Sequence, residues 1–215
     1  MNATAARLAA LALISAVSAT NVTAFAQTDA VAETAVEVVD PEAFVDSLVG
    51  ELRTLAEAKA TGETVDLQAV FSRELDTKRM QRQLLSRESR KVATRDEFDV
   101  YRELFPTYIA TVYADSIDEL VSRTIEVEGH RERGKSGSGD FIVRSRLYDK
   151  KGKARARIDW RVLYRENQLR LVDVLVEGQS VNIERRAQFT AIVKNDGFSA
   201  LIDHMRDQLG QPTPS

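Results

Sequence analysis

The chain of 215 residues contains no cysteine. Cysteine provides disulfide bonds, thiolate metal ligands and thiol nucleophiles, so all three are excluded. A domain without disulfides must be held together by its hydrophobic core, and a chain of this length can bury a sufficient one. Charge is nearly balanced as well, since 30 basic residues face 33 acidic ones. Overall charge therefore does not point to a partner.

Histidine is scarce, because the chain has only His130 and His204. They lie far apart, no cluster has the spacing of metal ligands, and we expect neither a metal nor a cofactor. Residues 129–136 fit the letters of a P-loop, but a strand pattern follows where a phosphate-binding helix is needed, so nucleotide binding is not expected. Two acids in predicted strands, Asp159 and Asp173, are candidate catalytic carboxylates or partners of neighbouring arginines.

The chain also lacks an apolar run of the roughly 20 residues that a membrane-spanning helix needs. Its apolar stretch at Leu8–Ala19 follows Arg7 and precedes the small residues Ala24 and Ala26, a pattern typical of a secretory signal peptide. We predict that residues 1–26 are a signal peptide cleaved after Ala26 and that the protein is exported. Residues 27–40 lack strong periodicity and are predicted to form a flexible leader.

Residues 41–209 are predicted to form one domain, and residues 210–215 a short tail. In the first part of this domain, residues 41–93, apolar residues recur at helical spacing. The second part, residues 94–209, has the pattern of a helix, a sheet and further helices. The predicted helices of the first part are Pro41–Ala60 after an N-cap at Asp40, Val65–Leu75, and Thr77–Lys91. A capping box at Thr94–Glu97 then opens a long helix to about Val121, which Pro106 is expected to kink or divide.

From Ser122 the apolar period changes to two, which predicts four antiparallel strands joined by short turns. Their expected ranges are Arg123–His130, Asp140–Tyr148, Lys153–Arg165 and Gln168–Glu177. The third strand alternates most clearly, with apolar residues at the even positions from Ala154 to Tyr164 and mostly charged residues between them. The sheet therefore has an apolar and a charged face, and we expect the long aromatic helix to cover the apolar one.

Two surfaces have more than one interpretation. Residues 131–166 hold 12 cations and five acids, so the charged sheet face is either a solvated surface or a docking face for an acidic partner or anionic lipid headgroups. Nucleic acid is not expected for an exported protein. The aromatic stripe from Tyr101 to Tyr113 is either part of the core or the wall of a cavity between helix and sheet.

The most specific pattern lies at the C-terminal end. A buried strand at Leu171–Glu177 meets a glycine corner with Ser180 as the N-cap, and a helix follows over Val181–Val193. Asn195–Gly197 ends that helix, and an amphipathic helix over Phe198–Leu209 completes the domain. This succession of corner, helix, stop and helix is unusual enough to compare with known families.

The succession resembles the MlaC/toluene-tolerance family. Asp173–Ser180 matches that family's D-V-x-x-E-G-x-S corner, Arg186 and Phe189 its R-x-x-F helix, and Gly197–Ile202 its G-x-x-x-L-I tail. Ile158–Val162 is similar to its V-D-Y-R-V strand. The likeness extends over about residues 41–209.

The resemblance implies an α+β, nuclear-transport-factor-like fold. Its antiparallel sheet of about four strands would be covered by a long helix, with an N-terminal helical subdomain and two C-terminal helices. The implied role is that of a periplasmic carrier, not an enzyme, which shuttles phospholipids between the outer and inner membranes and so maintains lipid asymmetry. The implied partners are an outer-membrane lipoprotein–porin complex and the MCE subunit of an inner-membrane ABC transporter.

On this interpretation, apolar side chains of the long helix and the strands form the wall of a lipid pocket. The predicted wall residues are Phe105, Tyr108, Val112, Tyr113, Ile158, Trp160, Val162, Val174 and Val176. Arg186 and Phe189 are expected to hold the last helix onto the sheet, which is a structural role. The alternatives are an enzyme that uses Asp159 or Asp173 in the same cavity, a relative specific for hopanoids or another lipid, and an adaptor whose cavity is filled by its own side chains.

Overall fold

The computed structural model describes residues 39–115 and 123–211, so the predicted signal peptide and most of the leader lie outside the described residues. The helices are α1 (Pro41–Ala60), α2 (Leu67–Glu74), α3 (Thr77–Leu84), α4 (Arg87–Val92), α5 (Arg95–Asp115), α7 (Val181–Asp196) and α8 (Phe198–Gln208). The strands are β1 (Thr124–Glu132), β2 (Asp140–Tyr148), β3 (Ala154–Arg165), β4 (Gln168–Val176) and β5 (Gln179–Ser180).

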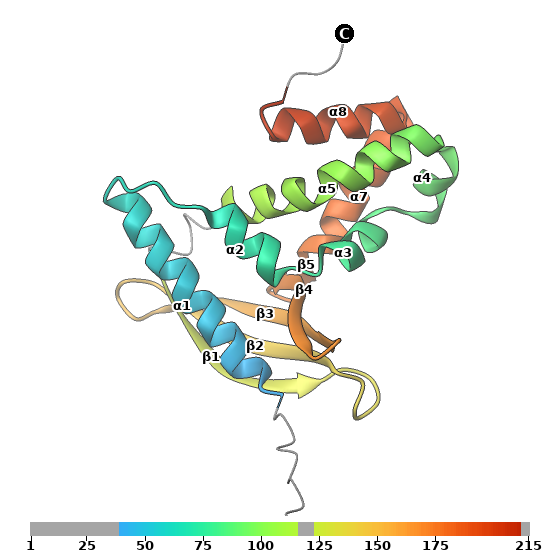
Figure 1. Cartoon of the computed structure of the whole chain (residues 1–215). Coiled ribbons are helices and arrows are strands. Elements are labelled where there is room, and N and C mark those ends of the chain that lie inside the picture. The colour runs from blue at the N-terminus through green and yellow to red at the C-terminus, as the bar shows by residue number, and fades with distance from the viewer. Residues whose placement is uncertain (1–38, 116–122, 212–215) are drawn as a thin grey trace, which may run out of the picture. The chain divides into compact units, whose positions relative to one another are not determined.

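The strands form one antiparallel sheet in the order β1-β2-β3-β4-β5, as Figure 1 shows. Sequential strands are neighbours throughout, so the predicted α+β fold with a meandering sheet is confirmed. The structure has one strand more than the four predicted. This strand, β5, pairs with the end of β4 through Gln179 and Ser180. It follows a tight corner at which Gly178 has a φ of 82°, a value that favours glycine.

The predicted helix starts are confirmed by side-chain hydrogen bonds. Asp40 Oδ1 accepts from the backbone N–H groups of Glu42 and Ala43, at 3.0 and 2.9 Å. Thr94 Oγ1 accepts from the N–H of Glu97, whose carboxylate accepts in return from the N–H of Thr94. Ser180 Oγ caps α7 in the same way. Each cap satisfies donors that the first helical turn leaves free.

Two helix predictions were wrong in detail. The expected helix over 77–91 is divided into α3 and α4, because Leu85 is extended and Ser86 begins a new helix by accepting from the N–H of Ser89 at 2.9 Å. Pro106 was expected to kink or divide its helix, and of these two outcomes the division does not occur, because α5 continues through it. Proline cannot donate to the carbonyl four residues earlier. That carbonyl, on Arg102, accepts instead from Gln81 Nε2 at 3.0 Å.

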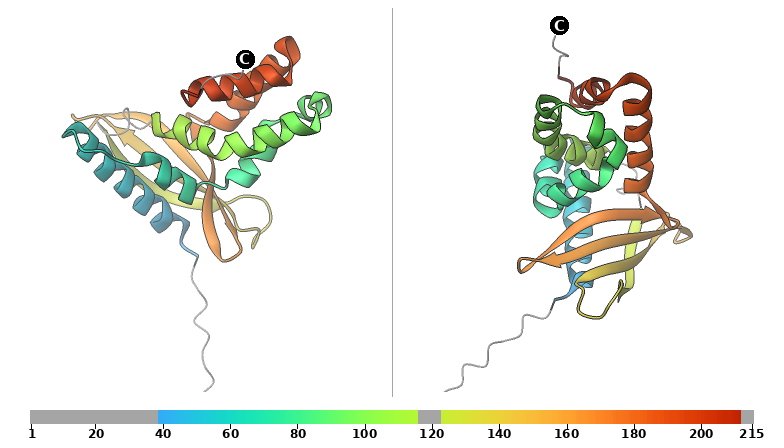
Figure 2. Two further views of the ribbon diagram at one scale, coloured as in Figure 1. Left: turned by 45° about the horizontal axis from the view of Figure 1, so that its top comes forward. Right: turned by 90° about the vertical axis from the view of Figure 1, so that its right-hand side faces the viewer.

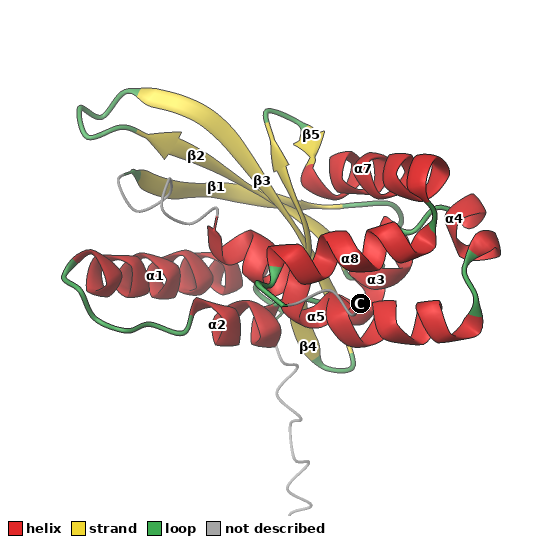
Figure 3. Cartoon of the chain, turned by 90° about the horizontal axis from the view of Figure 1, so that it is seen from above, coloured by secondary structure: helices red, strands yellow, loops and turns green. Residues whose placement is uncertain are grey.

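A long helix covers the sheet as predicted, but it is α1 rather than the aromatic helix. In Figure 1, α1 crosses the face of the sheet, and it packs on β1 and β2. The aromatic helix α5 lies among helices, against α2, α3 and α8. Figure 3 shows α1 beside the strands and α5 alongside α8, and the two views of Figure 2 show the helices gathered on one side of the sheet. Within the described ranges, no helix is long and apolar enough to cross a membrane.

Aromatic rings tie this helical layer together. Tyr101 contacts Phe105 and Phe198 with ring centroids 5.5 and 5.9 Å apart, and Tyr108 contacts Phe189 at 5.7 Å. Phe189 is fully buried and therefore packs α7 against α5. That Arg186 and Phe189 hold the last helix onto the sheet stays a prediction, and Arg186 is exposed.

We expect Phe189→Ala to lower the free energy of unfolding by about 3–5 kcal/mol, because it removes a fully buried ring and leaves a cavity. Urea denaturation followed by circular dichroism measures this loss. Ile183→Ala is the matched control, since Ile183 lies on the same helix and is 72% exposed. Its expected effect is within about 0.5 kcal/mol. Equal losses in both variants would contradict this account of the core.

Candidate functional site

A cavity of about 340 Å³ lies between the sheet and helices α1, α2, α5 and α7. Its wall is mainly apolar, and the strands β2, β3 and β4 provide one side of it. The lining residues are Leu52, Phe71, Val112, Tyr113, Arg123, Leu147, Ala156, Ile158, Trp160, Val174, Val176, Val181 and Arg185. Its volume is at the lower end of the range of about 300–1,000 Å³ for ligand pockets.

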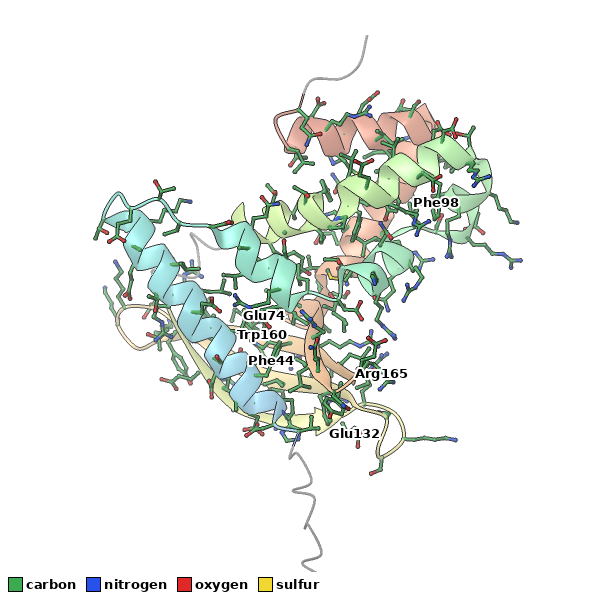
Figure 4. All side chains as sticks on the ribbon, in the orientation of Figure 1. Phe44, Glu74, Phe98, Glu132, Trp160 and Arg165 are labelled. Carbon is green, nitrogen blue, oxygen red and sulfur yellow. The ribbon has the colours of Figure 1, made fainter. Side chains whose placement is uncertain are left out.

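The alternation of side chains along the strands decides which residues of the sheet face the cavity. Successive even positions of β3, Ala156, Ile158 and Trp160, face the cavity, and so do Val174 and Val176 of β4. Trp160 and Val174 are paired in the register of the two strands, which brings this wall together across them. Figure 4 labels Trp160 within the ribbon of the domain. Because most of these side chains are small, the sheet leaves space that the helices do not fill.

The one polar atom of the Trp160 side chain has its hydrogen-bond partner within the sheet. Its indole Nε1 donates to Ser145 Oγ at 2.9 Å, and Ser145 donates in turn to the carbonyl of Ile158 at 2.9 Å. Ser145 is fully buried, so this pair is shielded from solvent. The tryptophan can therefore present an apolar surface to the cavity without an unsatisfied donor.

Six of the predicted wall residues surround this cavity, namely Val112, Tyr113, Ile158, Trp160, Val174 and Val176. The other three, Phe105, Tyr108 and Val162, are fully buried in the core and do not line it. The periodicity of a helix or strand indicates which of its faces is buried. It does not indicate which residues of that face pack in the core and which line a cavity. Contact of the six with a ligand stays a prediction.

Several lining residues of the cavity were not predicted from the sequence. Leu52 and Phe71 come from α1 and α2, which were assigned to a separate helical part and not to the wall. Val181 and Arg185 line the cavity from α7. A signal was present, because these two residues are four apart and share one side of a helix.

Arg185 brings a positive charge to the apolar wall. Its guanidinium influences Tyr108, Tyr113 and His204, whose Oη, Oη and Nε2 atoms are buried without hydrogen-bond partners. Burial raises the pKa of Tyr108 and Tyr113, and the charge of Arg185 offsets part of this increase. Burial lowers the pKa of His204, and Arg185 lowers it further. The groups around the guanidinium are therefore held neutral near pH 7.

The two candidate catalytic acids do not line the cavity. Asp159 is paired with Arg157 at 3.4 Å. Asp173 lies instead in a second hollow, of about 300 Å³, with Arg161, Arg186 and the start of α7. Its carboxylate accepts from Ser180 Oγ at 2.6 Å and from the N–H of Asn182 at 3.2 Å. Burial raises the pKa of Asp173, and these hydrogen bonds account for its position at the helix start.

Many cations of the charged sheet face have anionic partners within the sheet. Arg146 bonds Glu128 at 2.6 Å, and Arg161 bonds Asp140 through two nitrogens at 2.9 and 2.7 Å. Such pairs agree with a solvated, cross-strand network. No group of three or more histidines and acids among the described residues could hold a metal ion.

The fold and the cavity together define the class of α+β proteins that enclose an apolar hollow between an antiparallel sheet and a layer of helices. Within this class the chain belongs to the MlaC family, because the family described as MlaC protein matches residues 27–207. The family resemblance found in the sequence is thereby confirmed.

Among solved structures, the chain is similar to a phospholipid-binding protein from Ralstonia solanacearum in complex with a phospholipid. The two share 19% sequence identity with a TM-score of 0.60, over 80% of this chain and 98% of the other. At this identity the likeness establishes the fold. No curated protein sequence matches the chain.

We expect Ser145→Ala to lower the free energy of unfolding by about 1–3 kcal/mol, because the buried Trp160 N–H loses its acceptor. Denaturation followed by circular dichroism measures the loss. In a Trp160→Phe background the same change should cost less, since no donor is then left unpaired. A cost that is equal in both backgrounds would show that Ser145 does not serve Trp160.

The raised pKa of Asp173 predicts that the stability of the protein depends on pH. Because its native pKa is raised, the native state holds a proton in a pH range where the unfolded chain has released it. The contribution of Asp173 to stability therefore falls as pH rises from about 4, the ordinary value for aspartate, through the native value. The free energy of unfolding of Asp173→Asn relative to the wild type should be higher at pH 7 than at pH 4.

Denaturant titrations at the two pH values test this expectation. Asp46→Asn is the control, since it removes an exposed carboxylate from α1. If the difference between Asp173→Asn and the wild type is constant, or shrinks toward pH 7, burial does not govern this carboxylate.

Proposed function

We propose that this protein is a lipid carrier of the MlaC family that shields the acyl chains of a phospholipid in the cavity between its sheet and helices. The observation that supports this function best is the cavity itself. It is lined by apolar side chains of β2, β3 and β4 and of four helices. The cavity belongs to a chain whose family match spans residues 27–207.

The volume of the cavity favours an occupant. Protein interiors are close-packed, with few voids larger than a water molecule. A hollow of about 340 Å³ is far larger than such voids, and its mainly apolar wall gives water few hydrogen-bond partners. An apolar ligand suits such a wall better than water does.

The free energy of exposing lipid tails explains why a carrier is needed. Two acyl chains have roughly 30 methylenes, and their transfer to water costs on the order of 25 kcal/mol at about 0.8 kcal/mol each. A free lipid therefore does not cross an aqueous compartment at a useful rate. A carrier must also release its lipid, so its cavity should be about as favourable as a bilayer and no more.

The setting is part of the proposal. The family and the predicted signal peptide favour the periplasm, where the carrier would move lipid between the outer and inner membranes and help to keep them asymmetric. Its proposed partners there are an outer-membrane lipoprotein–porin complex and the MCE subunit of an inner-membrane ABC transporter. The neighbour in complex with a phospholipid supports the choice of ligand.

Two alternatives receive less support. An enzyme that uses Asp159 or Asp173 in this cavity would need that carboxylate on the wall, and neither is among the described lining residues. An adaptor without a ligand would fill the hollow with its own side chains, but the small residues Ala156, Val174 and Val176 leave it open.

Trp160 provides a direct test, because it is the only tryptophan of the chain and lines the cavity. We expect delipidated protein to show quenching of tryptophan fluorescence when it takes up phosphatidylglycerol with brominated acyl chains. Bromine quenches only at short range, so the signal reports tails inside the cavity. Native mass spectrometry of the same samples should show one added lipid mass.

Two alanines of β3 give matched variants. Ala156→Phe places a ring in the cavity and should reduce quenching and lipid load several-fold, whereas Ala154→Phe adds the same ring at an exposed position and should change neither. Circular dichroism checks that both variants are folded. A protein that binds no lipid, or that binds it equally in both variants, would refute the proposed site.

A further inference from the structure

The charges on the wall of the cavity are all of one sign. Arg123 and Arg185 are its only charged lining residues among those that the structure describes, and no acid accompanies them. A cavity that only had to hide hydrocarbon would not need a cation, because removing a guanidinium from water is costly. Arg123 is exposed to solvent, but Arg185 is partly buried and therefore requires an explanation.

Arg185 is partly buried and has no acid as a partner among the described side chains. Its Nη1 donates to the neutral Oε1 of Gln188 at 2.8 Å, and its guanidinium also acts on the Tyr108 hydroxyl. The described side chains show no ion pair between Arg185 and an acid, whereas four arginines of the strands each have one. Among the described side chains, no carboxylate is therefore paired with this positive charge beside the apolar hollow.

The neighbours of Arg185 cannot supply the missing charge. Tyr113, which shares the cavity wall, keeps its proton because burial raises its pKa, and the same holds for Tyr108 behind it. His204 is neutral because burial lowers its pKa. Asp173 also acts on Tyr113, but its carboxylate is bound to Ser180 and Asn182. This carboxylate therefore already has hydrogen-bond partners.

We propose that Arg185 is a specificity-determining residue that selects lipids with an anionic oxygen, either a phosphate or a carboxylate, and no compensating cation. Arg123 contributes positive charge to the same cavity. This inference rests on the proposed carrier function and deepens it by naming the class of lipid. A guanidinium binds phosphate and carboxylate through charge-assisted hydrogen bonds, and it repels the ammonium group of a zwitterionic headgroup. Neutral lipids such as polycyclic hydrocarbons with hydroxyl groups would leave it unpaired.

The test is a competition on the full-length mature protein after delipidation. Phosphatidylglycerol competes with phosphatidylethanolamine of the same acyl chains, and palmitate competes with hexadecanol. Native mass spectrometry reads the bound species. We expect the anionic member of each pair to be favoured about tenfold or more, as for a hydrogen bond to a charged group. The phosphatidylglycerol and palmitate arms distinguish phosphate from carboxylate as the preferred source.

Neighbouring arginines on α7 provide the variants. Arg185→Gln should lose most of the preference, and Arg185→Lys should retain part of it, because it keeps the charge without the planar fork. Arg186→Gln is the control, since Arg186 is exposed and lines the second hollow instead of the cavity. Thermal unfolding checks the fold of each variant. Total lipid uptake by Arg185→Gln should remain measurable.

The outcomes separate the two proposals. If the wild type binds anionic and neutral lipids equally, or if Arg185→Gln keeps the full preference, the selectivity is refuted and the carrier function stands. If no lipid of any charge binds, the carrier function fails and the selectivity fails with it. A preference that Arg186→Gln abolishes as fully as Arg185→Gln would also overturn the assignment to Arg185.

Discussion

The structure depends on the need to cover the apolar face of one sheet without filling it. Strands β2, β3 and β4 turn Leu147, Ile158, Trp160 and Val174 toward the helices, and α1 lies across this face. Large side chains on both sides would close the gap completely. The wall instead contains Ala156 and several valines, and a hollow of about 340 Å³ persists. The same side chains that hold the domain together therefore define its cavity.

The polar groups near this hollow differ in whether they have hydrogen-bond partners. The indole N–H of Trp160 is satisfied by Ser145 inside the sheet, so that the ring offers only hydrocarbon to the cavity. The hydroxyl groups of Tyr108 and Tyr113 are buried without partners, close to Arg185. Unpaired buried polar atoms are uncommon in stable domains and often mark function. The corner formed by α5 and α7 thus differs chemically from the rest of the wall.

Local patterns predicted most of the architecture, because caps, turns and strand alternation are encoded by neighbouring residues. The starts at Asp40, Thr94 and Ser180 and the four main strands were predicted within a few residues. Errors arose where distant residues decide. Gln81 compensates for Pro106 from another helix, and α1 covers the sheet in place of α5. Neither effect leaves a signal in the residues around it.

The cavity shows the same limit of sequence reasoning at the level of single side chains. Tyr108 and Tyr113 are both aromatic residues of α5, yet the first is packed in the core by Phe189 and His204 and the second reaches the cavity wall. Arg185 and Arg186 are adjacent and chemically identical, but the turn of α7 directs them to different hollows. A helix rotates by about 100° per residue, so neighbours face different environments. Residue type gives the available chemistry, and the helix position decides whether that chemistry meets a ligand.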